Sequence, residues 1–298
     1  MLRRVIGYFA VLAAGAALAA LPHAGAAQGA AAAAANPWAL RQNAESCYLE
    51  RSFGAGATKA DLIIQSFGAS TPYHVLVRSP LLPLRPERAA SAQVGFAGAK
   101  SAEEALVLLG KSGDAPMMVF AAARRASQSN FLGWLYEGTR THATQVVLIQ
   151  PSDRELSISL AGSGAIDLDL GAMADEYDRL DACADAIEHK WAQAAAGSGA
   201  PVDAPKKSPE TFSNWQVKYP PNLLLARISG LVELRLTIDP SGRAKDCVVQ
   251  MATWSPGFGE HACSDLKEYG RFEPAHDAQG KPVSALFRTG VMYMIYDW

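Results

Sequence analysis

Residues Gly230–Arg243 read GLVELRLTIDPSGR, and this stretch decides the fold of the C-terminal part of the chain. Apolar and polar side chains alternate along Leu231–Ile238, which is typical of a strand with one buried face. The following Asp239–Gly242 has the composition of a tight turn, with proline preset for the second position and glycine closing it. Lys245–Met251 therefore returns as the second strand of a hairpin.

The flanking sequence supplies two helices and a last strand. Asn222–Arg227 follows a pair of prolines and predicts a short helix. Phe258–Tyr269 carries apolar residues at helical spacing, which predicts a second helix after the hairpin. Val283–Tyr296 alternates again and predicts a long final strand, with Gly290 allowing a bend. The predicted order is helix, hairpin, helix and long strand.

Five fragments within this order resemble the C-terminal domain of the TonB family. They are Gln216–Pro220, Gly230–Leu234, Asp239–Arg243, Gly270–Ala275 and Gly280–Val283. Each fragment alone is weak, but the set resembles the family in order and spacing. The resemblance covers residues 213–298, which is under a third of the chain.

The resemblance implies a small α+β domain that is not catalytic. Such a domain captures a short extended segment of an outer-membrane transporter by adding it to an open sheet edge, where unpaired main-chain groups accept it. Position by position, the resemblance implies that the partner-binding residues are Val283, Ser284, Ala285, Leu286, Phe287 and Arg288, with Gln216, Lys218, Tyr219 and Pro220 nearby. The alternative is that Val283, Ala285 and Phe287 are simply core residues.

The first 27 residues have the features of a secretory signal peptide. Arg3 and Arg4 precede an apolar run from Val5 to Leu21, and small residues follow at Ala24–Ala27. A retained inner-membrane anchor is the alternative, because the run is near the minimum length for a span. We expect a cleaved leader, a disordered Ala-rich tail at residues 28–36 and a periplasmic protein that contacts the membrane only if the leader is kept.

Residues 37–193 predict a β-rich N-terminal domain that one amphipathic helix closes. Apolar residues recur at steps of three and four from Met173 to Trp191, which places them on one helix face. Ser101–Gly110 is a weaker helix prediction. The predicted strands of this domain are Asp61–Phe67, Tyr73–Arg78, Gln93–Phe96, Met117–Ala122, Gln145–Ile149 and Leu156–Leu160. Residues 194–212 are rich in Ala, Gly, Ser and Pro and predict a flexible linker to the C-terminal domain at 213–298.

The chain has four cysteines. An exported protein enters an oxidising compartment, where such cysteines can form disulfides. Four cysteines allow three pairings, and spacing alone does not choose among them. The predicted domain boundary places two cysteines on each side. It therefore favours the disulfides Cys47–Cys183 and Cys247–Cys263.

Neither composition nor motifs point to chemistry. A formal net charge of −2 gives no reason to expect a nucleic-acid partner. No two histidines lie three or four residues apart, as a helical metal site requires, so we expect no metal and no cofactor. Ser264–Lys267 matches an S-x-x-K motif without its companion motifs, which makes chance the better explanation. We predict that the protein is not an enzyme.

The resulting hypothesis is a TonB-like periplasmic protein that binds extended segments of outer-membrane transporters or other envelope partners, in support of transport across the membrane. The N-terminal domain then supplies a second contact or a spacer. The alternative is a stand-alone structural or binding module that keeps the TonB fold without energy coupling. That alternative rests on two departures from the family, a leader that looks cleavable and a linker that is short.

Overall fold

The computed structural model of the chain describes residues 37–68, 71–84, 88–124, 146–208 and 218–295. The chain divides into two units, Met1–Asn36 and Pro37–Trp298, and every described residue belongs to the second unit. The predicted leader and Ala-rich tail lie outside the described residues. None of the helices in the described ranges combines the length and the apolar character that crossing a bilayer requires. The fold is α+β, with many strands and few helices.

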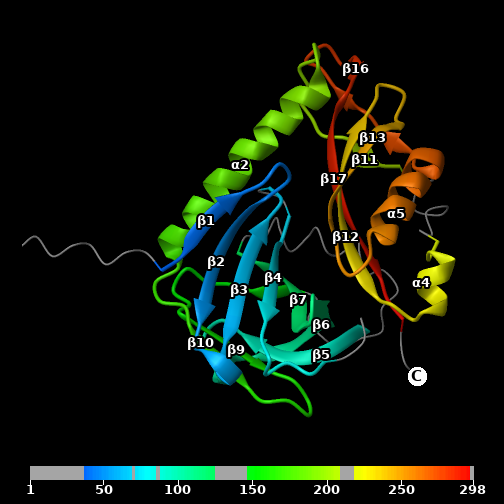
Figure 1. Cartoon of the computed structure of the whole chain (residues 1–298). Coiled ribbons are helices and arrows are strands. Elements are labelled where there is room, and N and C mark those ends of the chain that lie inside the picture. The colour runs from blue at the N-terminus through cyan, green and yellow to red at the C-terminus, as the bar shows by residue number, and fades with distance from the viewer. Residues whose placement is uncertain (1–36, 69–70, 85–87, 125–145, 209–217, 296–298) are drawn as a thin grey trace, which may run out of the picture. The chain divides into compact units, whose positions relative to one another are not determined.

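The N-terminal part of the second unit is one large, strongly bent antiparallel sheet (Figure 1). Its strands follow the order β1-β2-β3-β4-β7-β6-β5-β9-β10, and β8 pairs in parallel with β7. The Trp38 indole N–H donates to the Leu170 carbonyl at 3.1 Å, which joins the two ends of the strand order. The strands are β1 (Ala39–Gln42), β2 (Cys47–Phe53), β3 (Ala60–Ser66), β4 (Tyr73–Arg78), β5 (Arg88–Gly95), β6 (Glu103–Ser112), β7 (Ala115–Ala123), β8 (Val146–Leu148), β9 (Glu155–Ser159) and β10 (Ile166–Asp169).

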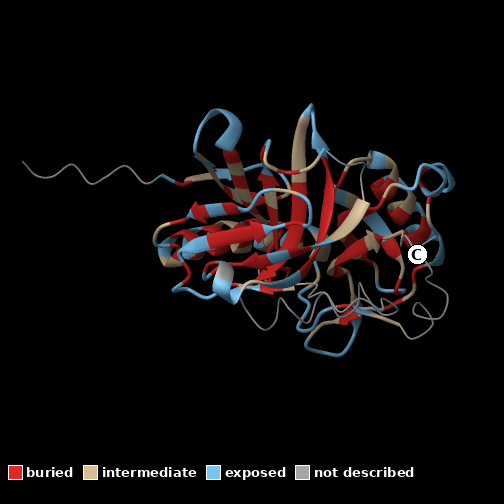
Figure 2. Ribbon diagram, turned by 90° about the horizontal axis from the view of Figure 1, so that it is seen from below, coloured by how far each residue is buried: buried red, intermediate tan, exposed pale blue. Residues whose placement is uncertain are grey.

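Residues 101–110 show where the apolar pattern was misleading. The predicted helix is wrong, because Glu103–Ser112 is strand β6. Ala105, Val107 and Leu109 face the core of the N-terminal sheet, whereas Leu106 and Leu108 face other clusters on its opposite side. Burial on both faces removes the alternation that identifies a strand, and a continuous apolar run then fits either structure. Buried residues accordingly follow both faces of the central strands (Figure 2).

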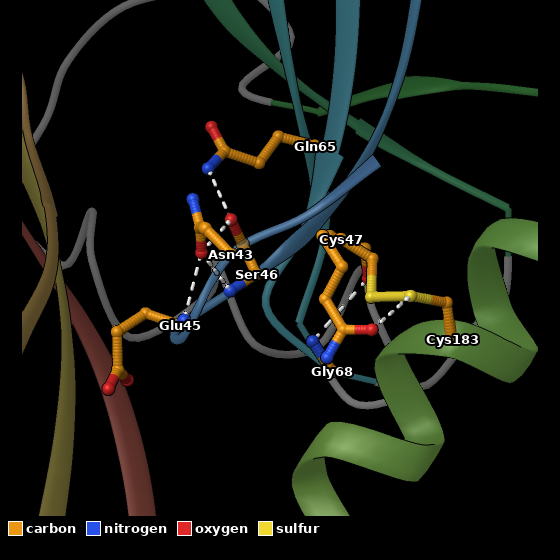
Figure 3. The surroundings of a disulfide bond; sticks show 9 residues. Asn43, Glu45, Ser46, Cys47, Gln65, Gly68 and Cys183 are labelled. Carbon is orange, nitrogen blue, oxygen red and sulfur yellow. Dashed lines mark hydrogen bonds between the residues drawn. A yellow bond between two sulfur atoms is a disulfide. The ribbon is translucent and has the colours of Figure 1, made fainter. Parts of the chain in front are cut away.

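Helix α2 (Ala174–Ala196) closes this sheet, as its periodicity predicts. Its buried side is formed by Tyr177, Leu180, Asp181, Ala184, Ile187 and Trp191, with Glu176 beside them. The Tyr73 hydroxyl donates to Asp181 at 2.5 Å, and burial together with that carboxylate raises the pKa of Tyr73. A disulfide joins Cys47 in β2 to Cys183 in α2 (Figure 3).

The C-terminal part is a three-stranded antiparallel sheet with helix α5 (Pro256–Tyr269) on one face. Its order is β13-β12-β17, which makes β13 and β17 the outer strands. Short helix α4 (Pro221–Leu225) precedes the hairpin, as the sequence predicts. The strands of this part are β12 (Gly230–Ile238), β13 (Ala244–Ala252) and β17 (Ala285–Tyr293), with the short pairing strands β11 (Lys206–Lys207), β14 (Phe272–Glu273), β15 (Ala275–His276) and β16 (Pro282–Val283).

The hairpin turn is held by one carboxylate. Asp239 Oδ1 accepts hydrogen bonds from the backbone N–H groups of Ser241 and Arg243 at 2.8 and 3.1 Å and from the Ser241 hydroxyl at 2.6 Å. Gly242 follows with φ of 77°, a left-handed conformation that glycine adopts without strain. The predicted turn thus has a clear physical basis in Asp239–Gly242.

Cys247 and Cys263 also lie at disulfide distance, so both predicted pairs are present in the structure. This bridge fixes β13 to α5. Gly259 of α5 lies directly under Val249, where a larger side chain would collide with the valine. Helix and strand therefore pack closely beside the bridge.

The opposite face of β12 is covered by the N-terminal sheet. Glu233 was predicted to face water, but it is only 1% exposed. Leu231 on the same face packs in a cluster with Leu108 and Val119 of the N-terminal sheet. The strand was therefore expected to be half buried and is buried on both faces, because a second layer lies over its polar side.

The predicted linker at 194–212 falls partly within the described residues. Helix α2 extends to Ala196, and β11 pairs with β14 of the C-terminal part, Lys206 opposite Glu273. Residues 209–212 lie outside the described ranges. The boundaries between the N-terminal domain, the linker and the C-terminal domain stay a prediction.

Candidate partner-binding edge

Strand β17 forms one edge of the C-terminal sheet. It pairs with β12 along its whole length, with Ile238 opposite Ala285 and Gly230 opposite Tyr293. Among the described residues, no strand pairs with its other side. Because the ladder has no register shift, the outer main-chain groups of β17 form a regular row.

Side chains along β17 alternate between two environments. Ala285 and Phe287 lie opposite Ile238 and Leu236 and share the face that packs toward α5. Leu286 and Arg288 face the other way, and Leu286 packs against the N-terminal core. Ala285 is buried and Phe287 is partly buried against the core, and both positions are compatible with pairing through their main chain.

The predicted final strand is interrupted near its start. Val283 belongs to β16 and pairs with Ala275, whereas β17 begins at Ala285. Ser284 is the connecting residue. Of the six residues predicted to receive a partner, Val283 and Ser284 therefore precede the main ladder, and Ala285–Arg288 lie within it.

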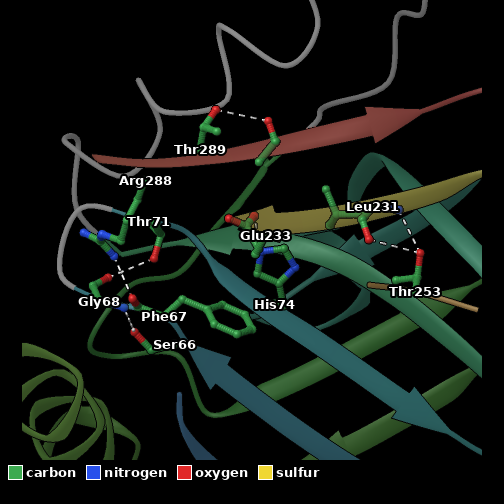
Figure 4. A network of polar contacts seen from close by, with 11 residues as sticks. Ser66, Phe67, Gly68, Thr71, His74, Leu231, Glu233, Thr253, Arg288 and Thr289 are labelled. Carbon is green, nitrogen blue, oxygen red and sulfur yellow. Dashed lines mark hydrogen bonds and ion pairs between the residues drawn. The ribbon is translucent and has the colours of Figure 1, made fainter. Parts of the chain in front are cut away.

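The Arg288 side chain is held by contacts with several other elements (Figure 4). Its guanidinium donates to the Phe67 carbonyl at 2.7 Å. It also donates to Glu188 of α2 at 2.7 Å. Burial lowers the pKa of Arg288, although the nearby carboxylates of Glu188 and Glu233 oppose that shift. Gly68 lies against the guanidinium, in space that any Cβ atom would need. The side chain is 5% exposed, so Arg288 fixes β17 to the N-terminal sheet and to α2.

The second part of the predicted site lies elsewhere. The Tyr219 ring contacts the ring of Tyr293 at 5.3 Å, at the end of β17 far from Ala285. Eight residues of strand separate the two ends, or about 26 Å. Lys218 donates its backbone N–H to Asp265 and Pro220 is buried before α4, while Gln216 is outside the described residues. The structure does not bring Lys218–Pro220 to Val283–Arg288.

Tyr219 packs against the core of the C-terminal part. Its hydroxyl donates to the Ile228 carbonyl, and its ring packs edge-on against Phe258 and Tyr293. Burial raises the pKa of Tyr219 to about 12. This tyrosine therefore stays neutral at physiological pH and anchors the segment before α4.

The contacts between the two sheets were missed from sequence. Glu233 meets His74 at 2.9 Å, and each side chain is 1% exposed (Figure 4). Arg235 pairs with Glu45 at 2.8 Å and lies over the Trp191 ring at 5.0 Å. Glu233 and Arg235 alternate with apolar residues as solvent-facing residues do, so the sequence holds no signal of their burial.

Strand β13 forms the other edge, and it is less regular. Its pairing with β12 shifts register twice, and each shift marks a bulge or similar irregularity. Between the two shifts, only Asp246–Val249 keep a single register with β12. A shallow groove lies at its end, lined by Val249, Met251, Trp254, Pro256 and Glu260. Bulges protect edge strands from further pairing, which favours β17 as the receiving edge.

The described part of the chain gives no other chemical candidate. Within it, no group of three or more His, Cys, Asp and Glu residues is arranged to hold a metal ion. Ser264 of the S-x-x-K match lies on α5 next to the disulfide-bonded Cys263. The geometry of the described residues thus offers main-chain recognition at a strand edge.

The comparisons with known proteins agree with this geometry. Residues 216–295 match the family model described as Gram-negative bacterial TonB protein C-terminal. A comparison with curated proteins found no match. The family comprises non-catalytic protein-interaction domains. The C-terminal part of this chain, residues 216–295, is therefore a TonB C-terminal domain.

Proposed function

We propose that this chain is a non-catalytic periplasmic protein that binds extended segments of outer-membrane transporters, or of other envelope partners, by strand addition. The observation that carries the proposal is the uninterrupted β17 ladder, whose outer side has no strand partner among the described residues. Within the predicted stretch Val283–Arg288, an extended segment that lies along residues 285–288 continues the sheet. Its own main chain then supplies the missing donors and acceptors.

Strand addition fits a protein that must recognise a short segment with few side-chain contacts. Successive residues of an edge strand direct their hydrogen-bonding groups alternately inward and outward. Each net main-chain hydrogen bond contributes about 0.5–1.5 kcal/mol. A handful of such bonds, less the cost of ordering the segment, limits the affinity to the micromolar range or weaker. Such affinity suits a contact that must form and release.

The N-terminal domain at 37–193 then provides a second contact or a spacer, and a cleaved leader releases the protein into the periplasm. The close packing of this domain on β12 supports the runner-up function as well, a stand-alone module without energy coupling. N-terminal sequencing of the protein from cells separates the two. A start near Ala27 or Gln28 supports the soluble module, and an intact, membrane-retained Met1 supports energy coupling.

Titration of the full chain with a labelled peptide from the N-terminal extended segment of a host transporter tests the proposal. The matched controls are two N-methylated versions of the same peptide, each lacking N–H donors at one set of alternate residues. We expect the unmodified peptide and one methylated version to bind, because only one set of amides faces β17. The other version keeps every side chain and loses binding.

Two results would contradict strand addition. One is the absence of binding at micromolar concentrations, together with normal transport in a deletion strain. The other is binding that neither methylated peptide loses, which would show recognition through side chains alone.

A further inference from the structure

Helix α2 lies beside the receiving segment of β17. Its C-terminal half reaches β17, and Figure 1 shows the end of the helix beside β16 and β17. Glu188 of α2 contacts Arg288, and Trp191 lies under Arg235 of the neighbouring strand. Just after the helix, Gly199 is in close contact with Val283. The part of the edge assigned to the partner is thus the part that α2 borders.

The Arg288–Glu188 pair is the polar centre of this contact. Arg288 projects from the face of β17 that looks toward the N-terminal sheet, and it is almost fully buried, whereas Glu188 is 26% exposed. The carboxylates of Glu233 and Asp185 also face this guanidinium. A buried cation needs compensation, so a carboxylate that leaves Arg288 must be replaced for the complex to remain favourable.

The geometry of strand pairing indicates which residue of an added strand could supply the replacement carboxylate. In a sheet, the residue of an added strand directly opposite Arg288 has its Cβ atom about 4.5–5.5 Å away, on the same face. Glu188 already holds a carboxylate against that face. An aspartate or glutamate of the incoming segment would make a cross-strand ion pair with the same guanidinium.

We infer that α2 closes the receiving edge through Glu188, and that the captured segment is an apolar extended strand with one acidic residue that takes over Arg288. This inference rests on the proposed strand addition at β17. It adds a gate and a specificity determinant to that site. Binding then requires α2 to move away from β17, so the apparent affinity is reduced by the small fraction of open molecules.

The specificity arm uses two synthetic nonapeptides of alternating valine and threonine, one with a central aspartate and one with asparagine there. On the full wild-type chain we expect the aspartate peptide to bind about tenfold more tightly. Arg288→Gln removes this preference. Glu188→Ala strengthens binding of the aspartate peptide by about tenfold, because the closed state loses its carboxylate. Asp175→Asn is the matched control on an exposed part of the same helix and leaves both affinities unchanged.

The gate arm uses a removable lock. A Cβ atom built on Gly199 lies 3.2 Å from Cβ of Val283, close to the spacing of a disulfide. The pair Gly199→Cys and Val283→Cys should therefore oxidise and hold the segment after α2 against β16. We expect the oxidised variant to lose binding of the aspartate peptide and the reduced variant to regain it. Wild-type chain treated with the same reductant controls for the two native disulfides.

The outcomes separate the gate from the function. Equal binding by locked and reduced forms, with the preference for aspartate absent, overturns the inference while strand addition survives at an uncovered stretch of edge. No binding of either nonapeptide or of a transporter peptide by any variant overturns the proposed function itself. A loss of stability in Glu188→Ala without tighter binding also overturns the inference, because it assigns Glu188 a purely structural role.

Discussion

Glu233 shows how a single residue joins the two sheets. It comes from the centre of β12 and meets His74 of β4, 159 residues away, where water is excluded. Removing one partner of a buried polar pair leaves the other uncompensated, whereas replacing both with apolar residues of similar size is tolerated. The pair therefore contributes more to the specificity of packing than to net stability.

We expect Glu233→Ala to lower the free energy of unfolding by about 3 kcal/mol, because His74 loses its buried partner. The double variant His74→Phe with Glu233→Leu should recover most of that loss. Urea denaturation of the three proteins measures both effects. A single variant as stable as wild type would show that the face of β12 is solvated.

The carboxylate of Asp239 is expected to make the stability of the fold depend on pH. Burial disfavours its charge, but the hydrogen bonds from Ser241 and Arg243 outweigh burial and hold the pKa of Asp239 below its usual value. A carboxyl group with a lowered pKa in the folded state stabilises the protein above its unfolded pKa of about 4, and this contribution disappears as pH falls through the folded pKa.

Asp239→Asn should accordingly destabilise the chain by up to about 1 kcal/mol at pH 7, because the charged acceptor is lost from an exposed turn. The difference from wild type should vanish near pH 2. Denaturation at the two pH values checks this. An equal difference at both would assign the effect to the shape of the side chain and not to its charge.

The contact between Arg288 and Glu188 could not be predicted from the sequence, whereas the hairpin turn could. The turn at Asp239–Gly242 could be predicted because its interactions are local. The ion pair joins residues 100 positions apart, and Glu188 lies in a helix that carries several other acidic residues. No local pattern indicates which of several acids meets a buried arginine.

Among the elements, the hairpin and α5 form a unit that the Cys247–Cys263 bridge closes. The two cysteines are 16 residues apart, and the bridge of Cys47 to Cys183 spans 136 residues. In the chain-entropy model, a loop of the first size contributes about 3 kcal/mol and a loop of over 100 residues nearly 5 kcal/mol.

Replacing Cys247 and Cys263 together with serine should therefore lower the free energy of unfolding by about 3 kcal/mol, and replacing Cys47 and Cys183 should cost more. Chemical denaturation under non-reducing conditions compares the two variants. The reverse order would contradict an effect that depends on loop length, and would favour strain or lost packing.

Element predictions succeeded where the sequence keeps a regular apolar period. α2 and the strands of the C-terminal hairpin have clear periodicity, and the structure confirms them. β6 was mistaken for a helix because both of its faces are buried. The break at Ser284 was missed because Val283 keeps the alternation although it pairs with Ala275 in another small sheet.

On the scale of the whole described unit, the C-terminal sheet is a middle layer. α5 covers one face of it and the N-terminal sheet covers the other. Gly110 of β6 lies directly against the Trp254 ring, in a space that holds no Cβ atom. A side chain at this position forces the two sheets apart.

Gly110→Val should therefore disrupt the packing between the sheets and broaden or split the thermal transition. Wild-type chain should unfold in one transition, because the two parts share buried surface. Calorimetry measures this, with Gly164→Ala as the control, since a Cβ atom at Gly164 meets nothing nearby. One sharp transition in the Gly110→Val variant would show that the contact contributes little.

The most direct test of the central claim is amide hydrogen exchange on the full chain with and without a bound transporter peptide. If β17 receives the segment, exchange slows at the outward-facing amides of residues 285–288, while β13 is unchanged and the end of α2 exchanges faster. Slower exchange at residues 246–249 of β13, or at no strand edge, would contradict recognition at β17.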